Sequence, residues 1–508
     1  MSCITCFGLD SKLPPKSLLL PPPEEQVDIT KDQFREFLFS EFNSAFEPNA
    51  QALPDDIYWD QPISKYWINT SHNTYLVGDQ LQSKSSVESY TKSLNRGCKC
   101  VELDCWDGKG SDIQAVVYHG HTLTSKILFV DILHAVDAYL TANKDSLPII
   151  LSLENHCSRS YQVTMAQQMK DILGDRLYVP SLLQENPNTP LPTPNQLRGM
   201  VVIKGKRPPE PDEGAMPSCD PTTDGGAEKK EIEKKSKTVP ELARLTLFHG
   251  TKFKSFDASS AMDNSHMHSI GESKFTKILN KGLASDWRKY NQYHMTRTYP
   301  AGFRVDSSNY NPTIPWAMGC QLVALNFQTP DTSLLLNDGR FRQAGGSGYV
   351  LKPDSVLGLP KPKPLSVKIS ILAGNCLPKP MGGKAGEVID PYVRVELHDV
   401  ADKGGKEEYV GDIWSSPTVT NNGFCPTWQQ ASRVFNVQHP DVAMFLFQVL
   451  DDDGMLNEAV GSCAIPMSCL RSGTRSVPLY NGHNSNSRGG AFDFATLLIR
   501  VDFTADSG

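Results

Sequence analysis

The chain has 508 residues and is too long for one compact core, so we expect roughly two to four domains. Its net charge of −7 argues against binding nucleic acid by charge alone. No run approaches the roughly 20 apolar residues that span a bilayer, so contact with an anionic membrane would need a local patch or a bridging cation.

The cysteines and the N-terminus indicate a cytoplasmic protein. Several of the 12 cysteines, among them Cys98, Cys100 and Cys320, lie in apolar runs, as reduced, buried thiols do. The first residues lack the regions of a secretory signal. Cys3 and Cys6 lie in an exposed-looking terminus, where reversible acylation would add a membrane anchor and a single C-x-x-C pair is weak evidence for zinc.

The N-terminal region predicts one helix. Residues 1–25 are rich in proline and predict an irregular tail. After the start signal of Thr30, apolar residues at helical spacing predict a helix from about Ile29 to Phe46. We assign residues 26–60 to an EF-hand-like helical remnant that should not bind calcium, because it has no D-x-D-x-D-G loop.

Residues 61–206 alternate between strand-like and helical runs, which predicts a parallel sheet. The strand-like runs are KYWIN, CVELDCW, AVVYH, PIILSLE and VVIK. They supply half of a barrel, and ARLTLF, YHMTR and CQLVALNF supply the other half within 241–358. Because neither half can close its sheet edges alone, we predict a multidomain α/β protein with one split (β/α)8 TIM-type barrel. The Pro-, Gly- and acid-rich residues 207–240 between the halves predict a disordered linker.

Residues 359–508 change to a period of two. The runs SVKISILA, PYVRVELH, MFLFQVLD and ATLLIRVDF, with turn residues between them, predict an antiparallel β-sandwich. Asp390, Asp451 and Asp453 fall on its expected loops and are candidate calcium ligands. The alternative is that they are ordinary turn aspartates.

Polar side chains stand at the ends of the expected barrel strands, as they do at the catalytic mouth of such a barrel. Their carboxylate, amide and imidazole groups suggest a hard divalent cation beside acid and base groups. Taken singly, a strand-end histidine is more often structural, and neighbouring charges often only form salt bridges; the joint occurrence favours function. The residues are His72, Asn73, Glu102, Asp104, His119, Glu154 and Lys204.

Over residues 30–505 the chain resembles the eukaryotic phosphoinositide-specific phospholipases C. The resemblance rests on the motifs INTSHNTYL, VELDCWDG, YHGHTLTSKILF, ILSLENHCS, YPAGFRVDSSNYNP, CQLVALNFQTP and GGSGYVLKP. It implies an X half-barrel at 61–206, a Y half-barrel at 241–358 and a C2 domain at 359–508. The short layout, without a pleckstrin homology domain, is similar to that of plant and protist members.

The resemblance also implies roles for single residues. The calcium ligands would be Asn73, Glu102, Asp104 and Glu154. His72 and His119 would be the catalytic pair, with Glu102 or Glu154 as general base. The headgroup contacts would be Lys204, Lys206, Ser269, Arg297 and Tyr299.

The function that the resemblance implies is lipid signalling. We expect calcium-dependent hydrolysis of phosphatidylinositol 4,5-bisphosphate, and of phosphatidylinositol 4-phosphate, to diacylglycerol and soluble inositol phosphate through a cyclic phosphate. We expect a monomer in the cytoplasm that binds the phosphoinositides of the anionic, cytoplasmic face of the plasma membrane and no nucleic acid. Leu81, Leu123 and Phe303 resemble the apolar rim that meets the bilayer, whereas His121 and Cys425 depart from the family's pattern.

Two alternatives remain open at this point. A glycerophosphodiester phosphodiesterase also uses a barrel with histidine and acidic ligands, but it needs no lysine pair such as Lys204 and Lys206. A catalytically silent relative would bind phosphoinositides as a scaffold. We also hypothesise that residues 207–238, with five acidic residues between Glu210 and Asp224, restrain the enzyme; the alternative is an inert tether.

Overall fold

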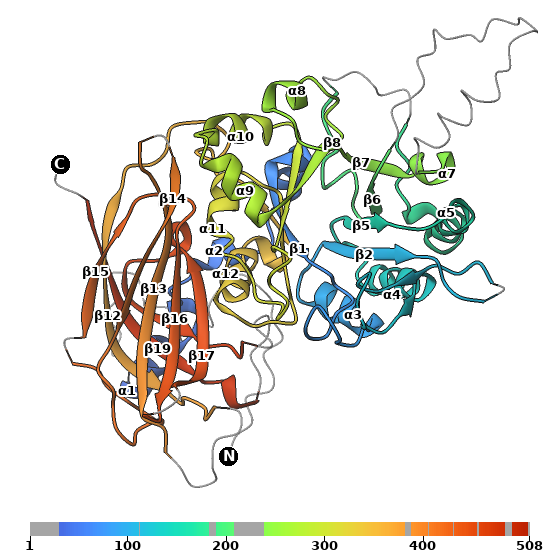
Figure 1. The fold of residues 1–508 in the computed structure, drawn as a ribbon. Coiled ribbons are helices and arrows are strands. Elements are labelled where there is room, and N and C mark those ends of the chain that lie inside the picture. The colour runs from blue at the N-terminus through green and yellow to red at the C-terminus, as the bar shows by residue number, and fades with distance from the viewer. Residues whose placement is uncertain are drawn as a thin grey trace, which may run out of the picture.

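Figure 1 shows the computed structural model of the chain, in which a barrel lies beside a β-sandwich. The structure describes residues 30–110, 112–181, 189–207, 238–380, 388–404, 406–429, 431–454, 457–482 and 490–505. The predicted tail with Cys3 and Cys6, and nearly all of the predicted linker, lie outside these ranges. Among the described residues, no helix has the length and apolar character needed to cross a membrane.

Eight parallel strands form the barrel, in the order β1-β10-β9-β8-β7-β6-β5-β2. A further parallel pairing of β1 with β2, through Thr70 and Cys100, closes the sheet. The split TIM-type barrel is therefore confirmed. The strands are β1 (Tyr66–Ser71), β2 (Cys100–Trp106), β5 (Ile149–Asn155), β6 (Val201–Gly205), β7 (Thr246–Gly250), β8 (His266–Gly271), β9 (Met295–Tyr299) and β10 (Leu322–Leu325).

Two details of the expected strands were wrong. The run AVVYH is no barrel strand: it contributes only β3 (Val116–Val117), which pairs antiparallel with β2 and with β4 (Ile127–Leu128). The eighth barrel strand is instead β8, which sequence periodicity missed because its polar residues interrupt the apolar pattern. A short strand β11 (Tyr349–Leu351) adds antiparallel to β1.

Helices cover the outside of the barrel, as Figure 1 shows. Alternate strand residues such as Met267, Met295 and Leu322 fill the barrel interior, and the residues between them face the helices. The helices are α3 (Val87–Asn95), α4 (Phe129–Ala142), α5 (Arg159–Leu173), α7 (Pro240–Ala243), α8 (Phe256–Ser260), α9 (Glu272–Leu279), α10 (Ala284–Tyr290), α11 (Thr313–Ala317) and α12 (Thr332–Phe341).

The C-terminal region is the predicted antiparallel sandwich. Its two four-stranded sheets have the orders β15-β12-β19-β18 and β14-β13-β16-β17. Alternate apolar residues of both sheets form one core. The strands are β12 (Leu365–Asn375), β13 (Pro391–Asp402), β14 (Glu407–Ser415), β15 (Ser432–Val437), β16 (Met444–Asp452), β17 (Asn457–Pro466), β18 (Gly473–Pro478) and β19 (Thr496–Ala505).

The N-terminal helix is shorter than expected. Helix α1 spans Lys31–Phe39 and starts with a capping box between Thr30 and Gln33, as the start signal predicted. It ends at Ser40, where the backbone becomes extended, because the following residues bond to the sandwich. The N–H of Ala45 donates to the carbonyl of Ser476 at 2.7 Å. The short helix α2 (Pro48–Gln51) follows.

Helix α12 holds the barrel against the sandwich. A Cβ atom at Gly339 would lie only 2.5 Å from the carbonyl oxygen of Ala464 on β17, so only glycine permits this approach. The buried Arg340 donates to the carbonyl of Val442 at 2.7 Å and lies over the rings of Trp67 and Trp316. The two domains therefore share a packed interface.

Candidate active site

A cleft of about 450 Å³ opens at the carboxyl ends of the barrel strands. Every barrel residue predicted to act in catalysis, metal binding or headgroup binding lines it, although these residues come from segments up to more than 200 residues apart. These residues are His72, Asn73, Glu102, Asp104, His119, Glu154, Lys204, Lys206, Ser269, Arg297 and Tyr299.

The turn after β1 positions His72 and Asn73. Asn73 has a left-handed backbone with φ of 41°, a conformation that asparagine tolerates better than most residues. Its N–H donates to Oε2 of Glu102 at 2.9 Å, and its Nδ2 donates to Oε1 of Gln80 at 2.8 Å. The second contact fixes the side-chain amide and leaves its oxygen as the remaining ligand atom.

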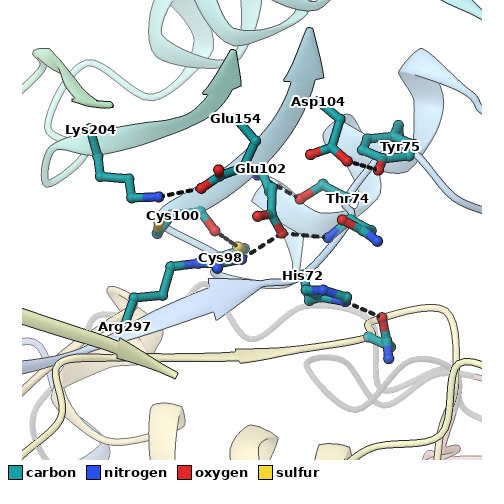
Figure 2. Close-up of polar contacts among 12 residues, drawn as sticks. His72, Thr74, Tyr75, Cys98, Cys100, Glu102, Asp104, Glu154, Lys204 and Arg297 are labelled. Carbon is teal, nitrogen blue, oxygen red and sulfur yellow. Dashed lines mark hydrogen bonds and ion pairs between the residues drawn. The ribbon is translucent and has the colours of Figure 1, made fainter. Parts of the chain in front are cut away.

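Three carboxylates gather beside this turn, as Figure 2 shows. Glu102 and Asp104 lie on the same face of β2, and the register pairs Asp104 with Glu154 of β5. Oδ2 of Asp104 accepts a hydrogen bond from the hydroxyl of Tyr75 at 2.9 Å, but its buried Oδ1 has no partner among the described residues. Burial, and then the charge of Glu102, raises the pKa of Asp104 well above its usual range.

Two buried cations face the carboxylates from the other side of the cleft. Nη2 of Arg297 lies 2.5 Å from Oε2 of Glu102, and Nζ of Lys204 lies 2.7 Å from Oε1 of Glu154. Burial acts to raise the pKa of Glu154, but Lys204 and Arg297 outweigh it and lower that pKa to about 2. Within the described part of the chain, the buried Nε of Arg297 and Oγ of Ser269 have no hydrogen-bond partner.

The two histidines are each held through Nδ1. Nδ1 of His72 lies 2.9 Å from Oδ1 of Asn326, and Nδ1 of His119 lies 2.6 Å from the carbonyl oxygen of Gln80. Because a carbonyl oxygen only accepts, Nδ1 of His119 carries a proton, which leaves Nε2 for chemistry in the cleft. Burial lowers the pKa of His72, so we expect a neutral ring before any anionic substrate arrives.

Sequence reasoning missed the residues that support this site. Gln80 contacts Asn73 and His119, and its Nε2 donates to Ser307 at 2.8 Å and to Asn326 at 3.3 Å. Asn326 was within a motif that signalled the family, but Gln80 lies in a loop where no periodicity marks it. His156 also lines the cleft and stacks on Trp106 with ring centroids 4.1 Å apart.

The carboxylate side of the cleft fits a hard divalent cation. Among the described residues, no three or more His, Cys, Asp or Glu side chains are arranged to hold a metal ion. Glu102 and Glu154 instead form ion pairs with Arg297 and Lys204. Oδ1 of Asp104 is nevertheless a buried acceptor that finds no donor within the described ranges. Three carboxylates and one amide oxygen are the ligand types that Ca²⁺ prefers.

Comparisons with known proteins identify the family. Profiles of the X domain and the Y domain of phosphatidylinositol-specific phospholipase C match residues 59–207 and 242–355, together more than half of the chain. A C2 domain profile matches residues 365–481. The chain belongs to the phosphatidylinositol-specific phospholipase C family.

Several relatives of this phospholipase C family match almost the whole chain. It is 36% identical over 509 residues to the rat 1-phosphatidylinositol 4,5-bisphosphate phosphodiesterase delta-1, covering 94% of this chain and 64% of that protein. It is 35% identical over 515 residues to the human inactive phospholipase C-like protein 2, covering 96% and 44%. The crystal structure of L. pealei PLC21 is similar with a TM-score of 0.78 and 32% identity, covering 94% and 60%. The chain thus spans less than two thirds of each relative's length.

The apolar rim residues predicted from the phospholipase C resemblance are exposed. Leu123 is 84% exposed, Phe303 71% and Leu81 48%, and the N–H of Leu123 donates to the carbonyl of Leu81 at 2.9 Å. His121, which stands where the family often has an aromatic residue, has its ring edge against Trp106 and φ of 62°. Exposed apolar side chains at the mouth of a cleft mark a surface that can contact lipid.

The acidic residues of the C2 domain have a different environment. Oδ1 of Asp451 accepts the N–H of Asp390 at 2.7 Å, and Oδ1 of Asp390 accepts the N–H of Asn421 at 2.6 Å. Cys425 is exposed and follows in the same loop. Asp453 directly follows β16, two residues before a gap in the described ranges. Both contacts join segments more than 30 residues apart and engage one oxygen of each carboxylate, so the C2 calcium site stays a prediction.

Proposed function

We propose that the protein hydrolyses phosphatidylinositol 4,5-bisphosphate, and phosphatidylinositol 4-phosphate, to diacylglycerol and soluble inositol phosphate with calcium as cofactor. The observation that carries the proposal is that one cleft contains both a buried acceptor and buried donors without hydrogen-bond partners in the described part of the chain. Among the described residues, Oδ1 of Asp104 is a buried acceptor without a donor, and Nε of Arg297 and Oγ of Ser269 are buried donors without an acceptor. A substrate that carries several phosphates, together with a divalent cation, would satisfy both.

Calcium would be held by Asn73, Glu102, Asp104 and Glu154. When bound, it would lower the pKa of the inositol 2-hydroxyl and offset the negative charge of the phosphodiester. The protein's own residues would carry the proton transfers. One of the two glutamates among these ligands, Glu102 or Glu154, would be the general base.

Two proton transfers complete the first half of the reaction. Glu102 or Glu154 accepts the proton of the 2-hydroxyl, whose oxygen attacks the phosphorus and forms a cyclic phosphate. His119 gives the proton on Nε2 to the diacylglycerol oxygen as the phosphorus–oxygen bond breaks. In the second half, His119 takes a proton from the water that attacks the phosphorus, and the same glutamate returns its proton to the inositol 2-oxygen as the cyclic phosphate opens. General acid–base steps of this kind typically contribute about 10²–10⁴-fold each.

His72 would stabilise charge on the phosphoryl oxygens. Its Nδ1 faces Asn326, so Nε2 is the atom available to the substrate. Burial lowers its pKa in the empty cleft, and an anionic phosphate beside the ring would raise it again. Tyr299 lies parallel to the His72 ring, with centroids 6.3 Å apart, and would limit its movement. Lys204, Lys206, Ser269 and Arg297 would contact the headgroup.

The rim of Leu81, Leu123 and Phe303 would rest on an anionic membrane, so we expect a peripheral protein at the cytoplasmic face of the plasma membrane. Reversible acylation at Cys3 or Cys6 remains part of this proposal, and so does the monomeric state.

A phosphoinositide-binding scaffold without activity is the second candidate, because one relative at 35% identity is named inactive. The decisive experiment measures release of labelled inositol phosphate from phosphoinositide vesicles in calcium and in chelator. We expect release in calcium alone. Binding to the vesicles without release would favour the scaffold, and release in chelator would contradict the calcium assignment.

A further inference from the structure

Strand β7 has no assigned part in headgroup binding, although the strands on both sides of it do. The residues predicted to contact the headgroup follow three strands in sheet order: Lys204 and Lys206 on and after β6, Ser269 on β8, and Arg297 and Tyr299 on β9. Strand β7 lies between β6 and β8 and pairs with both. The segment that follows it, from Gly250 to Lys252, also lines the cleft.

The sheet register brings Lys252 next to the assigned residues. Gly205 of β6 pairs with His249 of β7, so Lys206 leaves the barrel beside Gly250. Gly250 pairs with Met267 of β8, so Lys252 leaves the barrel beside Ser269. Both lysines are exposed at the cleft, whereas the buried Lys204 and Arg297 have carboxylate partners.

Three contacts to Thr251 hold this segment in place. The N–H of Thr251 donates to the carbonyl of Met267 at 3.3 Å. Its carbonyl oxygen lies 3.1 Å from Nδ1 of His268, and its hydroxyl lies 2.6 Å from Nε2 of His266. Because a carbonyl oxygen only accepts, His268 has to carry its proton on Nδ1.

The two histidines belong to a buried layer between the barrel and its helices. Met267 fills the barrel interior, so His266 and His268 on either side of it point outward. Nε2 of His268 lies 2.8 Å from the Ser259 hydroxyl on α8, and Nδ1 of His266 lies 3.3 Å from the Tyr290 hydroxyl on α10. Helices α8 and α10 therefore hold the rings of His268 and His266, and these two rings in turn hold Thr251.

We propose that Lys252 is a further binding residue for the ring phosphates of the inositol headgroup, and that His268 and His266 are positioning residues that hold the Thr251–Lys252 segment at the cleft. This inference rests on the proposed function for the identity of the ligand. With Lys206 and Lys252 on adjacent strand ends, two exposed ammonium groups would flank one phosphate, which suits a dianion.

The test measures binding of soluble inositol 1,4,5-trisphosphate to the full chain by calorimetry. We expect Lys252→Ala to raise the Kd about tenfold, as expected for the loss of one charge-assisted contact. The effect should shrink with each ring phosphate removed from the ligand. Lys254→Ala is the matched control, because this lysine is equally exposed two residues further on and does not line the cleft. We expect it to change the Kd less than about twofold.

The positioning role is tested at residue 268. His268→Leu removes the donor to Thr251, and we expect it to weaken trisphosphate binding and to add little in a double variant with Lys252→Ala. His268→Asn keeps a donor near the Nδ1 position and should restore binding. A purely structural role would lower the unfolding temperature in both variants and would weaken inositol 1-phosphate equally. That result would overturn the positioning role, while Lys252→Ala tests the lysine separately.

The outcomes separate this inference from the proposed hydrolysis. Unchanged trisphosphate binding in Lys252→Ala, or an equal loss in Lys254→Ala, would overturn the inference even if the enzyme is active. If the unaltered chain releases no inositol phosphate from vesicles but its trisphosphate binding depends on Lys252, hydrolysis fails and the inference stands. No preference for trisphosphate over inositol 1-phosphate in the unaltered chain would also overturn it.

Discussion

Acidic side chains gather both at the barrel mouth and on the sandwich loops, and their hydrogen bonding differs. In the barrel, Oδ1 of Asp104 is buried without a partner in the described part of the chain. In the sandwich, Asp451 and Asp390 accept backbone N–H groups at 2.7 and 2.6 Å. A buried acceptor that lacks a donor costs stability, whereas a carboxylate that accepts a backbone N–H contributes stability. The barrel acids therefore have the character of ligands, and the sandwich acids have the character of structural acceptors that join distant segments.

The largest expected effect is loss of the acid that protonates the leaving group. His119→Ala should lower hydrolysis of phosphatidylinositol 4,5-bisphosphate by about 10²–10⁴-fold, because Nε2 is the atom left for proton transfer. Raising calcium should not restore activity. His121→Ala, in the same loop but outside the cleft lining, is the control and should stay near the unaltered rate. Near-normal turnover of His119→Ala at saturating calcium would contradict the assignment.

The second prediction tests the comparison directly by a matched substitution in each region. Asp104→Asn should raise the calcium concentration for half-maximal hydrolysis of a soluble substrate at least about tenfold, because it replaces a charged ligand by a neutral one. Asp451→Asn should leave that concentration unchanged, since the asparagine oxygen can still accept the N–H of Asp390. Equal shifts in both variants would remove the distinction between the two regions.

Asp104→Asn also has an expected effect on the protein without calcium. The folded-state pKa of Asp104 is raised, so the folded chain binds more protons than the unfolded chain, and stability falls as pH rises above the unfolded value. Removing the charge should therefore raise the unfolding temperature of calcium-free protein near neutral pH. Thermal unfolding in chelator measures this, and a lower unfolding temperature would show that the carboxylate is not a strained ligand.

A third prediction concerns which apolar residues meet the membrane. Phe303 at the barrel rim and Phe424 beside Cys425 of the sandwich are 71% and 70% exposed. We expect Phe303→Ser to lower turnover on vesicles by roughly tenfold, in line with about 1.5–3 kcal/mol for an apolar side chain that leaves lipid, with soluble-substrate turnover unchanged. Phe424→Ser should have a smaller effect. The reverse order would make the sandwich loops the main membrane contact.

Much of the fold was predictable because apolar residues recur along the sequence with the period of a strand or a helix. CVELDCW and PIILSLE became β2 and β5, and the period of two after residue 359 became an eight-stranded sandwich. The failures have physical causes. AVVYH is as apolar as a barrel strand but pairs antiparallel outside the barrel, and β8 carries buried histidines that hide its pattern. Helix α1 ends early because contacts to the sandwich compete with helical propensity.

Strand-end positions indicated seven of the site residues, from His72 to Lys204, and the family motifs added the other four and assigned the roles. The motifs assigned no role to other residues that line the cleft, such as His156 and Lys252. They did not indicate Gln80, which joins Asn73, His119 and Asn326 through contacts across the barrel mouth. Nor did they indicate that Lys204 and Arg297 pair with Glu154 and Glu102 without substrate. Such contacts depend on distances between loops, which sequence spacing does not fix.

The smallest expected effect is that of a substitution at Asp451 in the sandwich. This substitution tests whether the sandwich acids bind calcium. Sedimentation of the His119→Ala chain with anionic vesicles that lack phosphoinositide measures membrane binding without hydrolysis. Because Asp390 and Asp451 already accept backbone N–H groups, we expect Asp451→Asn to change the calcium-dependent bound fraction by less than about twofold. Glu458, which pairs with Asp451 across β16 and β17, provides a control substitution as Glu458→Gln. Loss of calcium-dependent binding in Asp451→Asn alone would mean that these backbone contacts give way to a metal ion. The acids of the sandwich would then bind calcium as those of the barrel are proposed to do. The two regions would differ only in their affinity for calcium.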